Sequence, residues 1–286
     1  MFMDLIFLGT GTSVGIPMIG CHCPVCSSAD ARNTRRRTSL YVKTEHCAFV
    51  IDTPPDFRQQ MLDFKIERLD AVVFTHAHAD HIFGFDDIRR FNTLSGKVIP
   101  AYGEAETLVD VRRVFSYIGN SPETGGLYRP LVDFIPVEGT FQIGDVRVTA
   151  LDVRHGQKMT GYLLEAGGLR VGYVPDCRAM PAETVGRLKG VDIMILDALR
   201  YRPHPSHICV DESVGLLRMI GAGHSYLIHL CHDLDHGELA ARLPDGIDVS
   251  FDGLRVRLED TADGTARWSE QTGAPVMRPA AYGETQ

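Results

Sequence analysis

Short apolar segments rich in β-branched residues recur along most of the chain. They occupy residues 5–8, 48–51, 71–74, 98–102, 146–151, 169–174, 193–196 and 226–230. Runs of this length and composition predict strands. Between several of them, helix-period stretches occupy residues 104–117, 181–188 and 211–220. Strands interleaved with helices predict an α/β fold in which helices cover sheets.

The length of 286 residues is compatible with one layered α/β domain. Hydrophobic residues make up 44% and charged residues 23% of the chain, as is ordinary for a globular protein. After Thr261 the sequence becomes polar and rich in small residues. We therefore expect a single domain over residues 1–260 and a flexible tail over residues 261–286.

Charge and hydropathy narrow the expected partners. The formal net charge of −8 gives no global attraction for nucleic acid or for an anionic membrane surface. The N-terminus lacks a basic n-region, and no stretch has the apolar length that crosses a bilayer. We expect a cytoplasmic protein with neither a membrane nor a nucleic-acid partner. A homodimer is compatible with this composition.

The strongest chemical signal directly follows the predicted strand at residues 71–74. It is the segment Thr75-His76-Ala77-His78-Ala79-Asp80-His81. Functional groups of α/β proteins collect at the carboxyl ends of strands. Imidazole and carboxylate suit zinc, manganese or iron, and four such groups exceed the need of one tetrahedral ion. The segment predicts a pair of ions; the alternative is a solvated polar turn with incidental histidines.

This segment resembles the His-x-His-x-Asp-His signature of the metallo-β-lactamase superfamily, which His76, His78, Asp80 and His81 match in full. The resemblance implies a four-layer αββα sandwich with two facing sheets. It also implies that His76 and His78 hold a first metal, and that Asp80 and His81 hold a second.

The same resemblance calls for three later ligands, each at the end of a strand. His155 would complete the first metal site, Asp176 would bridge the two ions, and His229 would complete the second site. Two ions so placed would lower the pKa of a shared water, hold a hydroxide for attack and neutralise charge on a phosphoryl oxygen. Asp52, at the end of the predicted strand 48–51, is either a residue that orients a ligand histidine or a plain turn aspartate.

Three of the seven cysteines, Cys21, Cys23 and Cys26, fall within six residues. Such clustering favours a metal over a disulfide framework, and a tetrahedral structural zinc needs one more ligand. His232, three residues after His229, is the favoured fourth ligand, and His22 competes with it. The remaining alternative is a reduced cysteine-rich loop without metal.

The cysteine cluster, with the preceding Leu8-Gly9-Thr10-Gly11-Thr12-Ser13, resembles the phosphoribosyl cyclic phosphate phosphodiesterase subfamily from the glycine-rich start through Gly253. In such proteins the cysteine site is structural and the metal pair opens a cyclic phosphodiester of ribose. The resemblance places His207 near the substrate phosphate as an acid or a charge stabiliser. The alternative for His207 is a surface position beside a helix cap.

Two further motifs have ordinary explanations. The basic run at residues 32–37 could place guanidinium groups on a phosphate, but a solvated loop paired with nearby acids is the commoner arrangement. The glycine-rich residues 9–15 lack the lysine of a P-loop and the spacing of a dinucleotide fingerprint. A tight turn after the first strand accounts for these glycines.

Together these features predict a metal-dependent hydrolase. The expected reaction is phosphodiester hydrolysis of a small cyclic or nucleotide-like phosphate ester, with Asp80 and His207 in catalytic roles. The expected cofactors are two divalent active-site ions, zinc or manganese, and one structural zinc. One alternative is a nuclease similar to those that process the 3′ end of transfer RNA, and another is a non-hydrolytic metal-binding scaffold on the same fold.

Overall fold

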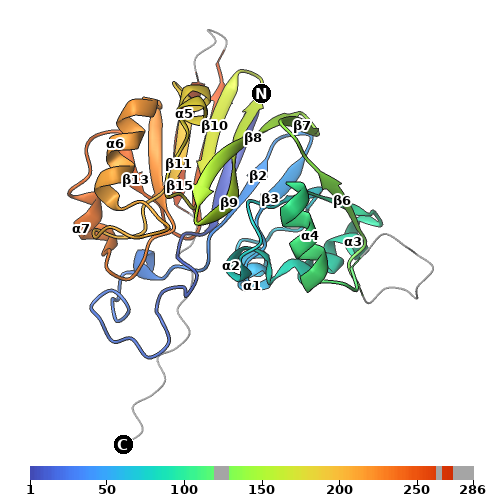
Figure 1. The fold of residues 1–286 in the computed structure, drawn as a ribbon, viewed down its shortest axis with the longest axis horizontal. Helices are drawn as coiled ribbons and strands as arrows, with labels where there is room; N and C mark the ends of the chain where they lie inside the picture. The colour runs from blue at the N-terminus through green and yellow to red at the C-terminus, as the bar shows by residue number, and fades with distance from the viewer. Residues whose placement is uncertain (119–128, 262–265, 273–286) are drawn as a thin grey trace, which may run out of the picture.

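The protein's computed structural model describes residues 1–118, 129–261 and 266–272. Two β-sheets pack face to face (Figure 1). The first has the strand order β15-β14-β1-β2-β3-β4-β5-β6. Its strands are β1 (Phe2–Gly9), β2 (Ser39–Lys43), β3 (Ala48–Ile51), β4 (Ala71–Val73), β5 (Ile99–Gly103), β6 (Val132–Pro136), β14 (Leu254–Asp260) and β15 (Ala266–Thr272).

The second sheet has the order β13-β12-β11-β10-β9-β8-β7. Its strands are β7 (Thr140–Ile143), β8 (Val146–His155), β9 (Gln157–Ala166), β10 (Leu169–Val174), β11 (Ile193–Asp197), β12 (His224–Ile228) and β13 (Ile247–Val249). Strands β10 to β13 run parallel to one another, as do β3 to β6 in the first sheet. Parallel strands bring their carboxyl ends to one edge, so each sheet presents a row of strand ends.

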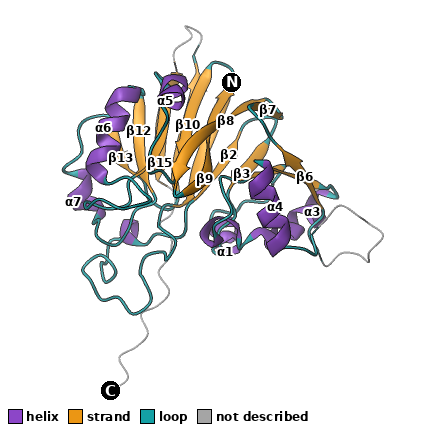
Figure 2. Ribbon diagram, in the orientation of Figure 1, coloured by secondary structure: helices purple, strands orange, loops and turns teal. Residues whose placement is uncertain are grey.

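The helices lie outside the two sheets, on opposite sides of the molecule (Figure 2). Helices α1 (Phe57–Asp63), α2 (Ala79–Ile82), α3 (Arg89–Ser95) and α4 (Ala105–Val114), with the 3-10 turn η2 (Phe85–Ile88), accompany the first sheet. Helices α5 (Ala182–Leu188), α6 (Val210–Ile220) and α7 (His236–Ala240) accompany the second. A further 3-10 turn, η1 (Ala31–Asn33), lies in the N-terminal loop. The predicted four-layer α/β sandwich is confirmed.

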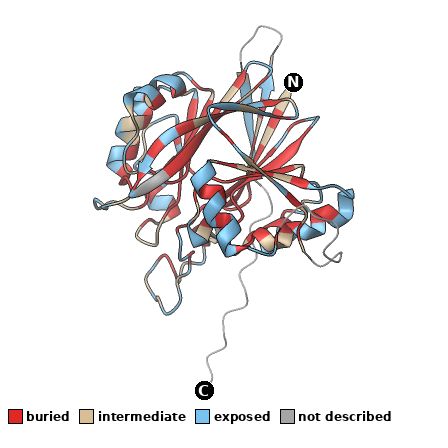
Figure 3. Cartoon of the chain, turned by 45° about the vertical axis from the view of Figure 1, so that its right-hand side comes forward, coloured by how far each residue is buried: buried red, intermediate tan, exposed pale blue. Residues whose placement is uncertain are grey.

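The side-chain pattern of β1 shows how the layers are built. Met3, Leu5 and Phe7 enter the core between the sheets, where Phe7 meets Tyr226 of β12 with ring centroids 5.4 Å apart. The alternate residues Ile6 and Leu8 face the helices of the first sheet. Because strands alternate their faces, a strand covered on both sides is apolar throughout. Figure 3 shows the resulting burial of the central strands.

Each strand and helix predicted from the apolar pattern is present, although most boundaries differ by a few residues. One prediction was wrong in part: residues 266–272, assigned to a flexible tail, form β15 and pair with β14. Their alternation was missed because most of their side chains are polar and exposed. The rest of the predicted tail, residues 273–286, lies outside the described residues. Among the described helices, none has the length and apolarity needed to cross a membrane.

The glycine-rich turn after β1 packs against the basic run. A Cβ atom on Gly9 or Gly11 would overlap the main chain of residues 35–37. Asp252 accepts hydrogen bonds from the amide and the hydroxyl of Thr10, at 2.9 Å and 2.8 Å. The glycines therefore permit close backbone packing, in keeping with the expected tight turn rather than a phosphate cradle.

Candidate metal centre

The first group of possible metal ligands combines residues from both sheets. His76 follows β4, His155 ends β8 and Asp176 follows β10. Nε2 of His76 lies 2.8 Å from Nδ1 of His78. Oδ2 of Asp176 lies 3.7 Å from Nε2 of His76 and 3.3 Å from Nε2 of His155. These four side chains offer ligand atoms that all lie within 4.8 Å of one another.

The second group lies on the other side of the Asp176 carboxylate. Asp80 and His81 belong to α2, and His229 follows β12. Oδ1 of Asp176 lies 3.6 Å from Nε2 of His81 and 3.5 Å from Nε2 of His229. Asp80 places Oδ2 3.4 Å from Nε2 of His81. The two oxygens of Asp176 thus face different sets of ligand atoms.

The donor atoms of these groups fit divalent cations. Nε2 of His81, Oδ1 of Asp176 and both ring nitrogens of His229 are buried without a hydrogen-bond partner among the described residues. Leaving buried polar atoms without partners is costly, and such atoms call for a bound species. Neutral imidazoles and carboxylates are ligands that zinc and manganese accept.

The protonation states of the centre agree with this fit. Burial lowers the pKa of His76 well below its usual value, and it lowers that of His155 to about 4. Burial also lowers the pKa of His81, but the carboxylates of Asp176, Asp52 and Asp80 outweigh it and raise that pKa well above the usual value. The carboxylates around His81 thus favour a positive charge on its ring. A bound cation would supply that charge in place of the ring proton.

Buried polar groups hold the rings in place. Oδ2 of Asp52 lies 2.8 Å from Nδ1 of His81, and Thr75 donates to both oxygens of Asp52. The carbonyl of Ser206 lies 2.7 Å from Nδ1 of His155. Asp52 and His229 both adopt positive φ angles, of 65° and 60°, which non-glycine residues seldom do. Of the two expectations for Asp52, the structure places it behind a histidine of the centre rather than at a plain turn.

One buried carboxylate escaped the sequence analysis. Asp197 ends β11, one residue beyond the predicted strand, and is wholly buried. Its Oδ2 lies 2.8 Å from Nδ1 of His207 and accepts a hydrogen bond from the amide of Cys177 at 2.8 Å. His207 is buried beside Asp176 and His229, not on the surface next to a helix cap. The rule that applied to Asp176, a carboxylate at a strand end, would have found Asp197.

A pocket of about 240 Å³ opens beside His207 and His229. Arg200, Arg202 and His204 contribute to its walls. Arg202 pairs with Asp233 at 3.0 Å, and Arg200 donates to the carbonyls of residues 202 and 203. These residues come from the loop after β11, whose course no periodicity predicts. The pocket places cationic side chains next to the ligand groups.

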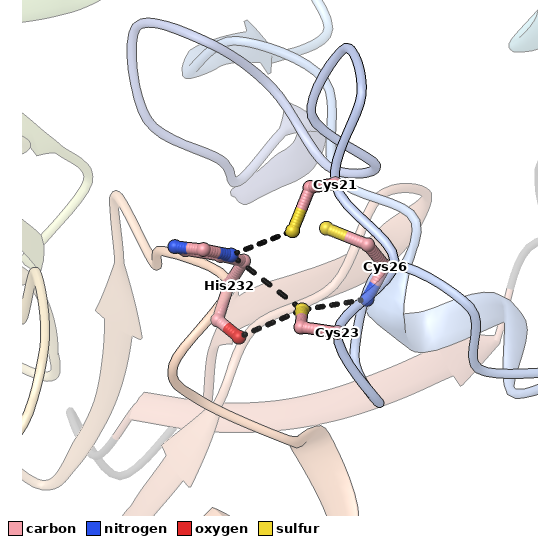
Figure 4. A group of neighbouring side chains, drawn as sticks. All are labelled: Cys21, Cys23, Cys26 and His232. Atoms are coloured by element: carbon pink, nitrogen blue, oxygen red, sulfur yellow. Dashed lines mark hydrogen bonds between the residues drawn. The ribbon is translucent and has the colours of Figure 1, made fainter.

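The structure brings Cys21, Cys23, Cys26 and His232 into one group (Figure 4). Nδ1 of His232 lies 3.4 Å from Sγ of Cys21 and 3.5 Å from Sγ of Cys23. Burial raises the pKa of Cys23, but the Cys26 amide and His232 outweigh it and lower the pKa to about 6. A thiolate is the metal-binding form of cysteine. His22 is not part of this group among the described residues.

The basic run anchors the loop that joins the two sites. Arg35 is buried and donates to the carbonyls of Cys231 and Leu234, at 2.9 Å and 2.7 Å, on either side of His232. Arg37 pairs with Asp56 at 3.1 Å. The run is therefore not simply a solvated loop, and Arg35 is not placed to bind a phosphate. The guanidinium of Arg35 instead donates to main-chain carbonyls beside the cysteine cluster.

Comparisons with known proteins agree with this architecture. A family model described as the Beta-lactamase superfamily domain matches residues 48–230, more than half of the chain. A diphosphatase from the PhnP family superposes with a TM-score of 0.82 at 37% identity, over 90% of this chain and 97% of that one. The Zn²⁺-bound PqqB of Methylobacterium extorquens superposes with a TM-score of 0.72 at 21% identity, over 88% and 99% of the two chains. The latter likeness concerns the fold alone.

A longer relative matches as well. The octanoyltransferase of Porphyromonas gingivalis is 35% identical over 263 residues, which are 90% of this chain and 52% of the relative. The chain thus spans about half the length of that relative. From the family model, the 37% identical structure and the fold, we conclude that the chain belongs to the metallo-β-lactamase superfamily.

Proposed function

We propose that the protein is a phosphodiesterase that hydrolyses a small cyclic or nucleotide-like phosphate ester. The observation that carries the proposal is the position of Asp176. Its two oxygens face two groups of ligand atoms, and a pocket with cationic walls adjoins them at His229. A phosphate ester is an anion that needs charge neutralisation at the site of attack.

In this proposal His76, His78, His155 and Asp176 hold one divalent ion, and Asp80, His81, His229 and Asp176 hold another. When bound, two such ions supply an ionised water as nucleophile and neutralise charge on the phosphoryl group. Cys21, Cys23, Cys26 and His232 hold a structural zinc. Zinc and manganese both suit the nitrogen and oxygen donors of the active pair.

The chain's own residues orient the substrate. Arg200, Arg202 and His204 line the pocket, and the two guanidinium groups attract an anionic ester. His207 also lines it, with Nδ1 held by Asp197. Burial lowers the pKa of His207 to about 4, so Nε2 can bind the phosphate or give a proton to the leaving oxygen only after the negative charge of the bound ester has raised that pKa and the ring has taken up a proton. Asp80 contributes a carboxylate beside His229, with Oδ2 and Nε2 3.8 Å apart.

The size of the pocket favours a small substrate. About 240 Å³ accommodates a sugar phosphate or part of a nucleotide. The net charge of −8 weakens the alternative of a nuclease that grips transfer RNA. A phosphoric anhydride is a second candidate substrate, because the 37% identical relative is a diphosphatase.

The test is a hydrolysis panel with zinc or manganese added. The substrates are bis-p-nitrophenyl phosphate, a ribose cyclic phosphate and a nucleoside diphosphate ester, and the proteins are the wild type and Asp80→Ala. Metal-dependent turnover of the diesters, lost in the variant, supports the proposal. Turnover of the diphosphate alone moves the substrate to the anhydride class. Metal binding without turnover of any substrate favours the non-hydrolytic scaffold.

A further inference from the structure

A second pocket lies on the outer face of the first sheet. Residues of β1, β2 and β14 and of the segment that follows α1 line it. Its volume is about 330 Å³. Ile6, Tyr41 and Phe64 give it an apolar floor. None of its lining residues belongs to a group of possible metal ligands among the described residues. The volume lies in the range of small-molecule sites.

The wall of this pocket is cationic although the protein is acidic. Five cationic side chains line it, namely Lys43, Lys65, Arg68, Arg255 and Arg257, against the two carboxylates of Asp4 and Glu67. The lining side chains alone carry an excess of three positive charges, which the carboxylates of Asp70 and Glu259 beside them reduce to one, in a chain whose net charge is −8. Such a local reversal of sign attracts anions against the field of the whole molecule.

The positive charge is only partly neutralised within the protein. Arg68 pairs with Asp70 at 2.8 Å, and Arg257 pairs with Glu259 at 2.8 Å. Lys43, Lys65 and Arg255 form no ion pair within 4.0 Å with another described residue; Lys43 and Arg255 act on Asp4 from farther away. Arg255 donates to the carbonyl of Phe64 at 3.5 Å, so Lys43 and Lys65 are the cations that a ligand can reach most readily.

Lys65 occupies its position at a conformational cost. It lies two residues after α1 ends at Asp63, with φ of 55°, and the main chain closes there with hydrogen bonds from the amide of Lys65 to the carbonyl of Leu62 and from the amide of Ile66 to the carbonyl of Met61. Glycine is the favoured residue at such a helix end. The only other described non-glycine residues with positive φ are Asp52 and His229 of the metal centre. A lysine at this place is explained if its side chain serves a ligand.

We propose that this pocket binds a small organic anion that carries at least two negative charges on an apolar, aromatic body. The cations at the rim would neutralise the charges, and Ile6, Tyr41 and Phe64 would contact the body. The proposal is independent of the reaction at the metal centre.

The probe is naphthalene-1,5-disulfonate, whose charges are fixed and whose sulfonates bind zinc and manganese weakly. Isothermal titration compares the metal-loaded wild type with the double variant Lys43→Met/Lys65→Gly and with Lys189→Ala, which removes an exposed cation outside the pocket. We expect saturable binding, about tenfold weaker in the double variant and unchanged in Lys189→Ala. Raising the salt from about 0.05 M to about 0.5 M should weaken binding by screening.

The single variant Lys65→Gly separates binding from folding. It relieves the positive φ, so its thermal midpoint should equal or exceed that of the wild type, while its affinity for the disulfonate should fall. Equal affinity in the wild type and the double variant, or no saturable heat, overturns the proposal. Binding of a polyglutamate peptide without binding of the disulfonate overturns it too, since the surface would then recognise an acidic protein segment.

Discussion

The Nδ1 atom of His207 lies 2.8 Å from Oδ2 of Asp197, a carboxylate that is wholly buried. The same oxygen accepts the amide hydrogen of Cys177, so its position is fixed by the main chain. A histidine held in this way presents one defined tautomer and one defined ring orientation. His207 is thereby oriented at the pocket beside the metal centre.

Replacing Asp197 with asparagine should impair turnover more than metal binding. An asparagine oxygen in the place of Oδ2 can still accept from the Cys177 amide, but the neutral side chain holds Nδ1–H of His207 less strongly than the carboxylate and does not stabilise a positive charge on the ring. We expect kcat on the best diester to fall by about 10- to 100-fold with little change in active-site metal content. Steady-state kinetics and metal analysis provide the check. Asp248→Asn, at the far edge of the second sheet on β13, is the control; full activity in Asp197→Asn would remove the role assigned to this pair.

Asp52→Asn should weaken metal binding itself. Asparagine tolerates the φ of 65° at this position. Its NH₂ group, however, would replace one carboxylate oxygen. In one orientation it would face the hydroxyl of Thr75 and Nδ1 of His81, and in the other it would face the amide N–H of Thr75. We expect the affinity of the active pair to fall by about 10- to 100-fold. Competition with a chromophoric chelator measures it. Zinc in the cysteine cluster should stay at wild-type content, and unaltered affinity of the active pair would contradict the prediction.

The sequence predicted most of what surrounds the metal centre because its residues follow strands. His76, Asp176 and His229 each come after an apolar run, and strand ends of facing sheets meet at one edge. The order in which the family's ligands follow one another along the chain predicted the remaining members of the two groups, including His155. Cys21, Cys23 and Cys26 were recognisable by their spacing, and His232 by its distance from His229.

Other parts could not be predicted, for reasons that differ. Strand β15 is mostly polar on an exposed edge, so it has no apolar run to mark it. Arg200 and Arg202 reach the pocket through a loop whose path depends on tertiary packing. Arg35 sits in a basic run that typifies a solvated loop, and only the fold shows that it is buried against carbonyls.

His232→Ala should remove one equivalent of zinc and destabilise the loop that leads to His229. The cysteine thiolates would lose their fourth ligand, and a structural zinc contributes directly to folding. We expect lower zinc content and a lower thermal midpoint, together with reduced turnover because Leu230 and Cys231 connect the two sites. The matched control is His22→Ala, which removes a histidine outside the group. Zinc loss in His22→Ala but not in His232→Ala would reverse the assignment.

The ring of His236 should make stability depend on pH in the acidic range. Burial, followed by the charges of Arg32 and Arg35, lowers its pKa to about 4, and Nδ1 has no hydrogen-bond partner among the described residues. Since the pKa in the folded protein lies below the unfolded value of about 6.5, the folded state binds fewer protons between these values. The neutral ring's contribution to the free energy of unfolding is present in full above about pH 6.5 and is lost as the pH falls towards 4.

His236→Met replaces the ring by a neutral side chain of similar size and removes this contribution. Between about pH 7.5 and pH 5 we expect the wild type to lose roughly 1–2 kcal/mol more unfolding free energy than the variant, as urea unfolding followed by circular dichroism would show. The histidines of the metal centre titrate in both proteins and therefore cancel in the difference. His46→Gln, at an exposed position, should follow the wild type. If His236→Met loses as much stability as the wild type on acidification, His236 is not the group responsible.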